Sequence, residues 1–277
     1  MDGPTDAEAR ERCYALLRDG DVQVVGRVVD ASNLALLVDV VGADGPAVPA
    51  IYKPVRGERP LWDFPTGTLA GREVASARIA EATGYAVVPP TVLRDGPAGV
   101  GSVQLWIGDP LADEPLPSPV GLAPAGTVPE GYLSIIDGEL PDGTTVTVVH
   151  EDADDVRDAA VLDAVLNNSD RKGGHLVRDG AGTLWGFDHG LTLHAEPKLR
   201  TVLWGWAGQP LREHDIVVLD ELANQLADSE APLTRELSTL LPTEDLAALR
   251  SRVQRLLLRG VHPLPSPGWP SIPWPAL

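Results

Sequence analysis

The stretch VLDAVLNNSDRKGGHLVRDGAGTLWGFDHGLTL, residues 161–193, decides how the rest of the chain is interpreted. It opens with an apolar segment typical of a helix, and a polar run follows at once. Two glycines lead into a predicted β-hairpin with strands at 175–177 and 183–187. Because a hairpin returns on itself, residues just outside its two open ends lie near each other. An acidic residue stands at each end, Asp170 before the hairpin and Asp188 after it.

The two carboxylates and the imidazole of His175 are therefore expected to converge on one point. Phosphoryl transfer requires such a set, because one group orients the nucleophile while others hold a divalent cation on the phosphates. We expect Asp170 to accept or orient the proton of an attacking hydroxyl, the simpler alternative being a turn aspartate. Asp188 follows an apolar strand, and a carboxylate in that setting needs a partner such as a divalent cation. His175 is either a second metal ligand or a strand histidine satisfied by hydrogen bonds.

The composition disfavours several classes of function. The net charge of −18, from 22 basic and 40 acidic residues, disfavours general nucleic-acid binding and docking on anionic membranes by charge alone. The single cysteine, Cys13, cannot form an intrachain disulfide, which fits a reducing compartment. The sequence shows no signal peptide and no apolar run long enough to span a bilayer. We therefore expect a cytoplasmic protein without stable membrane insertion.

The N-terminal half is predicted to be rich in β-structure. A capping box at residues 5–8 predicts a helix that reaches about Arg18. Hydrophobic patterns and turn residues predict a second helix at 72–83 and strands at 21–29, 34–41, 47–53, 87–93 and 101–107.

The C-terminal half is predicted to be mainly helical. Residues 108–143 are rich in Pro and Gly and are expected to be loop-like, so we place a boundary there between an N-lobe (1–108) and a C-lobe (109–277). A strand at 144–150 and helices at 154–167, 213–227 and 243–259 are expected to follow. The expected fold class is α+β, with the two-lobed outline of a protein kinase.

The last residues, 263–277, contain six prolines together with Trp269 and Trp274. Such a tail is expected to be extended and to dock its aromatic side chains on the body of the protein. The alternative is that it binds a partner.

Lysine is rare in this chain, which has three lysines and nineteen arginines. Lys53 ends a predicted strand, where a lysine can pair with nucleotide phosphates if an acidic residue holds it. Glu73, at the start of the next helix, is the expected partner, and Glu81 on the same helix is the alternative. The simpler interpretation is a surface lysine and a glutamate favoured by the helix dipole.

Two weaker patterns complete the expected nucleotide site. The turn at 30–33, which includes Ser32, can lay backbone N–H groups over phosphates, although it lacks the glycines of such loops. Gln104 and Trp106 lie between the predicted lobes, where main-chain groups can meet an adenine ring.

The motif Asp170-Arg171-Lys172, together with Asp188-His189-Gly190, resembles the catalytic loop and metal motif of phosphatidylinositol 3-/4-kinase-like enzymes. That group includes lipid kinases, related protein kinases and HipA-type bacterial kinases. The chain looks most like uncharacterised actinobacterial members, and its lysine-poor composition agrees with a high-GC genome. The resemblance implies a protein-kinase-like fold with ATP as donor. It also implies that Lys53 and Glu73 form the strand–helix pair, Asp170 is the catalytic aspartate and Asp188 binds metal.

Two positions depart from the family pattern, which has Asp-Arg-His and an Asn five residues after the Asp. Lys172 replaces the His and can stabilise the transferring phosphate as a cation. His175 replaces the Asn and is a softer ligand, which favours Mn²⁺ over Mg²⁺. We expect an ATP-dependent kinase using Mg²⁺ or Mn²⁺, with a protein acceptor or the chain itself as substrate. The alternatives are a lipid or small-molecule kinase and a nucleotide-binding pseudokinase regulator.

Overall fold

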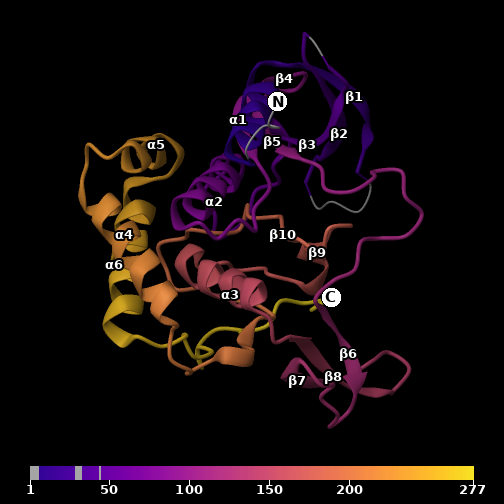
Figure 1. The fold of residues 1–277 in the computed structure, drawn as a ribbon, viewed down its shortest axis with the longest axis vertical. Helices are drawn as coiled ribbons and strands as arrows, with labels where there is room; N and C mark the ends of the chain where they lie inside the picture. Colours follow the sequence, from indigo (N-terminus) through magenta and orange to yellow (C-terminus); the bar gives the residue numbers. More distant parts are fainter. Residues whose placement is uncertain (1–5, 29–32, 44) are drawn as a thin grey trace.

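An antiparallel sheet of five strands forms the N-terminal part of the computed structural model, which describes residues 6–28, 33–43 and 45–277 (Figure 1). In sequence order its strands are β1 (Asp21–Arg27), β2 (Leu36–Val41), β3 (Val48–Pro54), β4 (Thr91–Gly96) and β5 (Gly99–Leu105), and their spatial order is β1-β2-β3-β5-β4. Helix α1 (Asp6–Asp19) covers one face, where Tyr14 and Leu17 join an apolar cluster with Val38 and Tyr52. The predicted strands are confirmed with ends that differ by one or two residues, except that residues 87–88 form a turn before β4. Residue 29, the last of the first predicted strand, lies outside the described residues.

Helix α2 (Leu69–Thr83) joins this sheet to the rest of the molecule. Most residues of α2 are buried, because the helix packs against β4 and β5 on one side and against α5 (Pro232–Leu240) on the other. Gly71 allows the close approach to α5, since a Cβ atom there would lie 2.6 Å from the carbonyl oxygen of Leu240. The helix begins three residues earlier than predicted, at Leu69 instead of Arg72, and ends at Gly84, whose φ of 68° is a left-handed cap.

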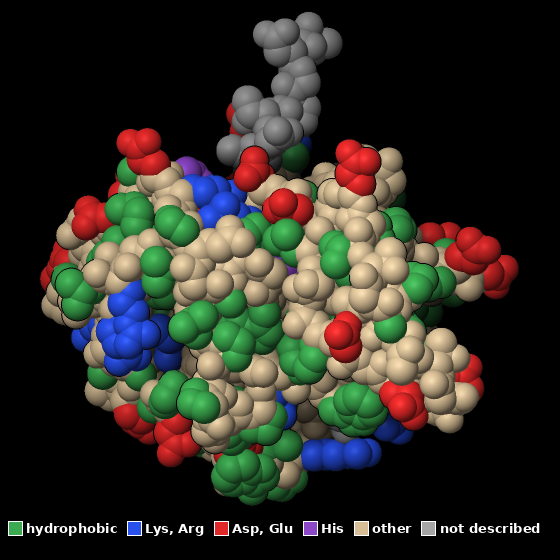
Figure 2. Space-filling model, turned by 90° about the horizontal axis from the view of Figure 1, so that it is seen from below, with side chains coloured by type: hydrophobic (Ala, Val, Ile, Leu, Met, Phe, Trp, Pro, Cys, Tyr) green, Lys and Arg blue, Asp and Glu red, His purple; other side chains and the backbone are tan. Residues whose placement is uncertain are grey.

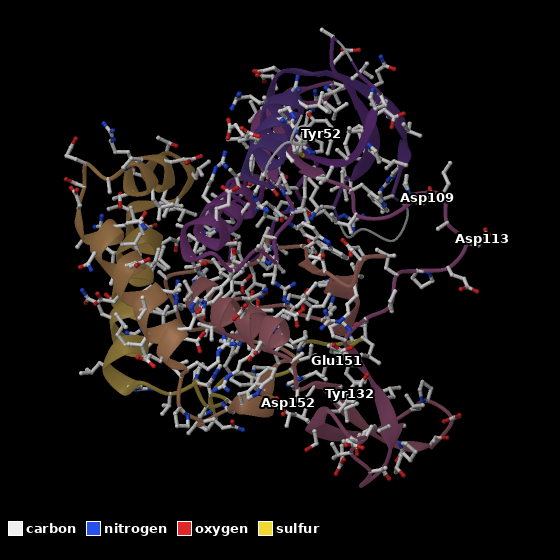
Figure 3. The ribbon with its side chains drawn as sticks, viewed as in Figure 1. Tyr52, Asp109, Asp113, Tyr132, Glu151 and Asp152 are labelled. Carbon is white, nitrogen blue, oxygen red and sulfur yellow. The ribbon has the colours of Figure 1, made fainter. Side chains whose placement is uncertain are left out.

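The region expected to be a loop, residues 108–143, contains two strands, and this expectation is wrong. Strands β6 (Val120–Pro124) and β7 (Tyr132–Glu139) flank β8 (Thr145–Glu151) in a three-stranded antiparallel sheet that projects from the body (Figure 1). Most side chains of β7 are exposed, so the strand lacks the alternation of apolar and polar residues that marks a half-buried strand. The segment before β6 does form a loop, and its Asp109 and Asp113 are exposed (Figure 3).

The remaining helices form the C-terminal part. Helix α3 (Asp154–Leu166) lies in the main apolar core, where α6 (Thr243–Arg259) packs against it, and α4 (Glu213–Ala227) and α5 pack against α6 (Figure 1). Helices α3, α4 and α6 confirm the prediction, whereas α5 was not predicted. The short hairpin of β9 (Leu176–Arg178) and β10 (Leu184–Gly186) follows α3. Arg178 binds Glu151 and Asp155 at 2.6 and 2.7 Å, which ties the hairpin to β8 and α3. The expected α+β class is confirmed.

The proline-rich tail lies along the body, as expected. The carbonyl oxygen of Ser271 accepts hydrogen bonds from the backbone N–H of Thr201 (3.0 Å) and the indole N–H of Trp204 (2.9 Å). Trp269 packs against Lys198, whose ammonium lies 5.2 Å from the ring centroid. Trp274 is 86% exposed, so the expectation that both tryptophans dock is wrong for this residue.

Acidic side chains are distributed around the face seen in Figure 2, and lysines and arginines occur in small groups between them. This face therefore differs from the continuous basic surface that nucleic-acid binding requires.

Within the described part of the chain, no helix combines the length and the apolar character that crossing a bilayer requires.

Candidate active site

Lys53 connects two distant parts of the chain at the centre of the candidate site. Its Nζ lies 2.6 Å from Glu73 Oε1 in α2 and 2.9 Å from Asp188 Oδ1, just after β10. The second carboxylate oxygen of Glu73 accepts the backbone N–H of His189 at 2.9 Å. Glu73 therefore holds both the strand lysine and the segment that carries Asp188. Glu81, the alternative partner, instead binds Arg10 at 3.0 Å.

The charges of this cluster stabilise one another. Burial alone would lower the pKa of Lys53, but the carboxylates of Asp188 and Glu73 raise it above its ordinary value. The Lys53 ammonium in turn holds the pKa of Asp188 well below its usual range. Asp188 has a φ of 62°, a left-handed conformation that Asp adopts more easily than most residues, and its side chain is 52% exposed. The site thus presents a charged carboxylate to solvent, where a cation can reach it.

Arg171 links the two acidic motifs. Its buried guanidinium is 3.0 Å from Asp163 in α3 and donates a hydrogen bond of 3.0 Å to the carbonyl oxygen of Phe187. It also lies 2.6 Å from Nε2 of His189. Burial, and then the Arg171 charge, keep the pKa of His189 well below its ordinary value, so this ring is neutral and accepts the hydrogen bond. Arg171 follows Asp170 in the chain and binds the residues on both sides of Asp188.

Asp170 is held at the end of a polar turn. Its backbone N–H donates to the side-chain oxygen of Asn168 at 3.0 Å, and Asn168 donates in turn to Asp163 at 2.9 Å. Lys172 Nζ lies 3.2 Å from the Asp170 carboxylate, and Nη2 of Arg200 lies 3.7 Å from it. The Asp170 side chain keeps 18% exposure, so a substrate hydroxyl can reach it.

His175 lies in a short 3-10 turn, η2 (Gly173–His175), instead of the predicted strand. Its Nε2 is 3.5 Å from Asp188 Oδ2, and burial lowers the pKa of the ring, which leaves a neutral imidazole that can bind a metal. No side-chain partner for its buried Nδ1 occurs in the described residues. The donor set of Asp188 and His175 fits a divalent cation that takes its other ligands from nucleotide phosphates and water. By themselves, the described residues contain no group of three or more His, Cys, Asp or Glu side chains placed for metal binding.

Gln104 and Trp106, the other expected nucleotide contacts that the structure describes, lie at the end of β5. Gln104 sits inside the sheet between Ile51 and Thr91, and its side chain donates to the Thr91 hydroxyl at 2.8 Å. Trp106 follows the end of β5, and its backbone N–H donates to the carbonyl oxygen of Pro49 at 3.0 Å. Ser32 lies outside the described residues.

Sequence reasoning missed the residues that bind and position the side chains of the site. Asp163 is a fully buried acid in α3. In the sequence, an acidic residue among apolar helix residues is the signal that could have indicated a buried cation partner. Nothing in the local sequence marks Arg200, whose Nη2 lies 3.7 Å from Asp170 Oδ1 in the folded protein.

Comparisons with known proteins concern the fold. No protein-family model matches the sequence. The structure is similar to that of the Golgi casein kinase with Mn/ADP bound, with a TM-score of 0.57 and 13% identity over 99% of this chain and 81% of the other. It is also similar to hydra Fam20 with sugar, with a TM-score of 0.54 and 14% identity over 93% of this chain and 89% of the other. The fold is therefore kinase-like.

A curated protein is similar over almost the whole chain. Protein Rv2133c of Mycobacterium tuberculosis is 44% identical over 273 residues, which cover 96% of each chain. The chain belongs to the same family as Protein Rv2133c.

Proposed function

We propose that this protein is a phosphotransferase, an atypical kinase that uses ATP and a divalent cation. The observation that carries the proposal is the position of Lys53, which contacts Glu73 and Asp188 at 2.6 and 2.9 Å. Kinases require a strand lysine held by a helical glutamate, beside a metal-binding aspartate. The similarity to a casein kinase with Mn/ADP bound supports both the nucleotide and the metal.

Each residue of the cluster then has a role. Lys53 binds nucleotide phosphates, and Asp188 with His175 holds the metal. A bound Mg²⁺ or Mn²⁺ supplies positive charge beside the phosphate oxygens. Asp170 accepts the proton of the attacking hydroxyl, and Lys172 stabilises negative charge on the transferring group.

We assign the protein to the phosphatidylinositol 3-/4-kinase-like group on its two short motifs, Asp170-Arg171-Lys172 and Asp188-His189-Gly190. We also propose two lobes that meet near residue 108, so that Gln104 and Trp106 lie beside the adenine. The free Cys13 supports a cytoplasmic location. The acceptor is a hydroxyl compound, and the sequence favours a protein, either another chain or this one.

Calorimetric titration of ATP, with and without Mn²⁺ or Mg²⁺, tests the proposal, together with release of ADP. We expect metal-dependent binding followed by turnover. Tight ATP binding without turnover on any acceptor would favour a nucleotide-binding regulator. In that case Lys172 and His175, which replace the His and Asn of the family pattern, would account for the lost activity. Labelled phosphate found only in an organic extract would favour a lipid kinase.

A further inference from the structure

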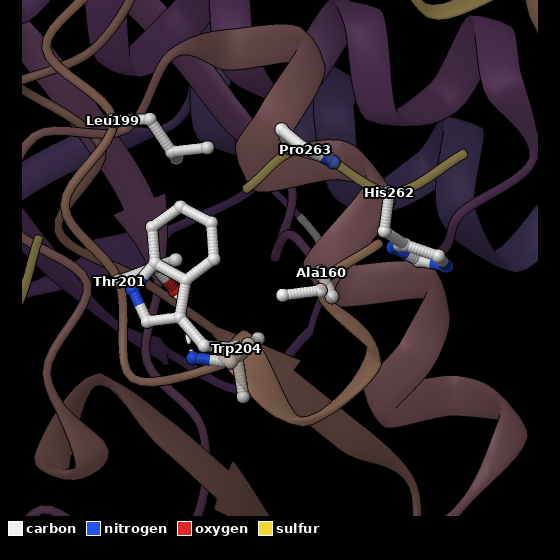
Figure 4. A pocket seen from close by; sticks show the side chains of 8 residues that line it. Ala160, Leu199, Thr201, Trp204, His262 and Pro263 are labelled. Atoms are coloured by element: carbon white, nitrogen blue, oxygen red, sulfur yellow. Dashed lines mark hydrogen bonds between the residues drawn. The ribbon is translucent and has the colours of Figure 1, made fainter. Parts of the chain in front are cut away.

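Two cavities among the described residues offer no binding site beyond the candidate active site. A cavity of about 230 Å³ has Trp62, Ser169 and Trp269 on its wall and adjoins Asp170, so it belongs to that site. Another, between α3 and the tail, has about 10 Å³ and room for roughly one water molecule (Figure 4). A further binding surface is instead present on the outside of the protein, on the sheet of β6, β7 and β8.

This sheet is anchored at its base and projects into solvent further out (Figure 1). At the base, Val120 of β6 pairs with His150 of β8, and both side chains are buried. Further out, Leu122 of β6 and Ile136 of β7 pair with Val148 from its two sides and are 43% and 47% exposed. Directly paired residues of antiparallel strands lie on the same face of a sheet. The sheet therefore presents apolar side chains to solvent on one face.

Strand β7 has a free edge. The sheet order is β6-β8-β7, so β7 pairs with β8 on one side, and no strand within the described residues pairs with its other side. The N–H and C=O groups of an edge strand can pair with another chain, and lysines, prolines or a bulge commonly prevent this. A bulge lies between Ser134 and Ile136, but residues 136–139 follow it, are all exposed and include neither lysine nor proline. This part of the edge is open to pairing.

The charge of this region has one sign. Residues 109–151 contain eight acidic residues and no lysine or arginine, whereas the rest of the chain has 32 acidic and 22 basic residues. In β7, Asp137 and Glu139 alternate with Ile136 and Gly138, so the two carboxylates lie on the face opposite Ile136. Asp137 accepts a hydrogen bond from Thr147, and neither carboxylate forms an ion pair with another described residue. Both charges are thus available to a cationic partner.

The free edge and these charges together restrict the occupant. In a second copy of this chain, two paired β7 edges would bring carboxylates close to one another, which is unfavourable. Nucleic acids and anionic membranes would meet a chain whose net charge is −18. A basic extended segment can pair its backbone with β7, place cationic side chains near Asp137 and Glu139, and place apolar ones near Ile136.

We propose that the outer edge of β7 is a docking site for an extended segment of a partner protein in which lysine or arginine alternates with apolar residues. The alternation follows from β7 itself, since successive side chains of a paired strand lie on opposite faces of the sheet. The docking is a binding function that stands apart from the proposed kinase function.

Calorimetric titration of the whole chain with three synthetic octapeptides tests the proposal. One peptide alternates lysine and valine, a second has the same composition with all lysines before all valines, and a third alternates glutamate and valine. We expect the alternating lysine peptide to bind at least tenfold more tightly than the other two. No binding of this peptide, or equal affinity for the two lysine peptides, would overturn the proposal, because the second result requires only attraction between charges.

Two charge reversals provide a matched pair of variants. Glu139 on β7 and Glu221 on α4 are both exposed, and replacing either by lysine changes the net charge by the same amount. We expect Glu139→Lys to weaken binding of the alternating lysine peptide at least fivefold more than Glu221→Lys does. Equal weakening would mean that binding depends on net charge alone and would overturn the assignment to β7. Both variants should bind ATP like the wild type, so failure of the docking site is distinguishable from failure of the kinase function.

Discussion

Lys53 Nζ lies 2.9 Å from Asp188 Oδ1, although the two residues are 135 positions apart in the chain. This contact joins the N-terminal sheet to the hairpin that follows α3. Because Glu73 binds both Lys53 and the backbone N–H of His189, the sheet, α2 and the hairpin meet at one point. The fold thus assembles the candidate site from segments that have no local relationship in the sequence.

Replacing Lys53 by Met should weaken ATP binding at least tenfold, about 1.4 kcal/mol or more, because the site loses the cation that meets the phosphates. Calorimetric titration measures the change. Arg18→Met, on the exposed side of α1, is the matched control and should bind ATP like the wild type. Unchanged affinity in a folded Lys53→Met protein would refute the role of this lysine.

His175→Asn introduces the amide that the phosphatidylinositol 3-/4-kinase-like pattern has at this position. Since imidazole is the softer ligand, the ratio of turnover with Mn²⁺ to turnover with Mg²⁺ should fall several-fold in this variant. His214→Asn, at an exposed position on α4, is the control. A ratio that stays the same in both variants would show that His175 does not bind the metal.

Asp163→Ala should destabilise the protein by roughly 3–5 kcal/mol, because it leaves the buried guanidinium of Arg171 without its charge partner. Chemical denaturation gives the free energy of unfolding. Asp220→Ala, on the exposed side of α4, should change that energy by less than about 0.5 kcal/mol. A small effect of Asp163→Ala would mean that Arg171 is stabilised mainly by its other contacts.

The stability of the protein should fall as the pH is lowered from about 6.5 towards 4. Burial, and then the neighbouring Arg157, lower the pKa of His262 from 6.5 to about 4. In this window the unfolded chain binds a proton that the folded protein excludes, so acid favours unfolding by up to about 3 kcal/mol. His262→Gln cannot take up that proton, and its unfolding energy should depend less on pH between 4 and 6.5. Identical pH profiles for the variant and the wild type would contradict this assignment.

The sequence was sufficient to predict the parts of the site that depend on local patterns. The end of α3, the hairpin turn and the flanking residues Asp170 and Asp188 follow from hydrophobic periodicity and turn residues within about thirty positions. Pairing Lys53 with Glu73 was possible because a strand end and a helix start lie close together in the chain.

The rest of the site depends on contacts between residues that are distant in the sequence, which local patterns do not predict. Asn168 and Arg171 are buried although they belong to a polar run, because both donate hydrogen bonds to the carboxylate of Asp163. Asn167 is buried because its side-chain amide bonds the backbone of His194, Glu196 and Lys198. A single sequence predicts that such a run is exposed. The cavity was missed for the same reason, since Trp62 and Trp269 come together only when the tail docks.

The central claim is tested most directly by measuring label transfer from γ-labelled ATP. The proteins compared are the wild type, Asp170→Ala and Asp188→Ala, each shown to be folded by its thermal unfolding. We predict metal-dependent transfer by the wild type and a loss of at least a hundredfold in both variants, because one lacks the proton acceptor and the other a metal ligand. Transfer that persists in both folded variants, or a wild-type protein that binds no ATP, would contradict the account.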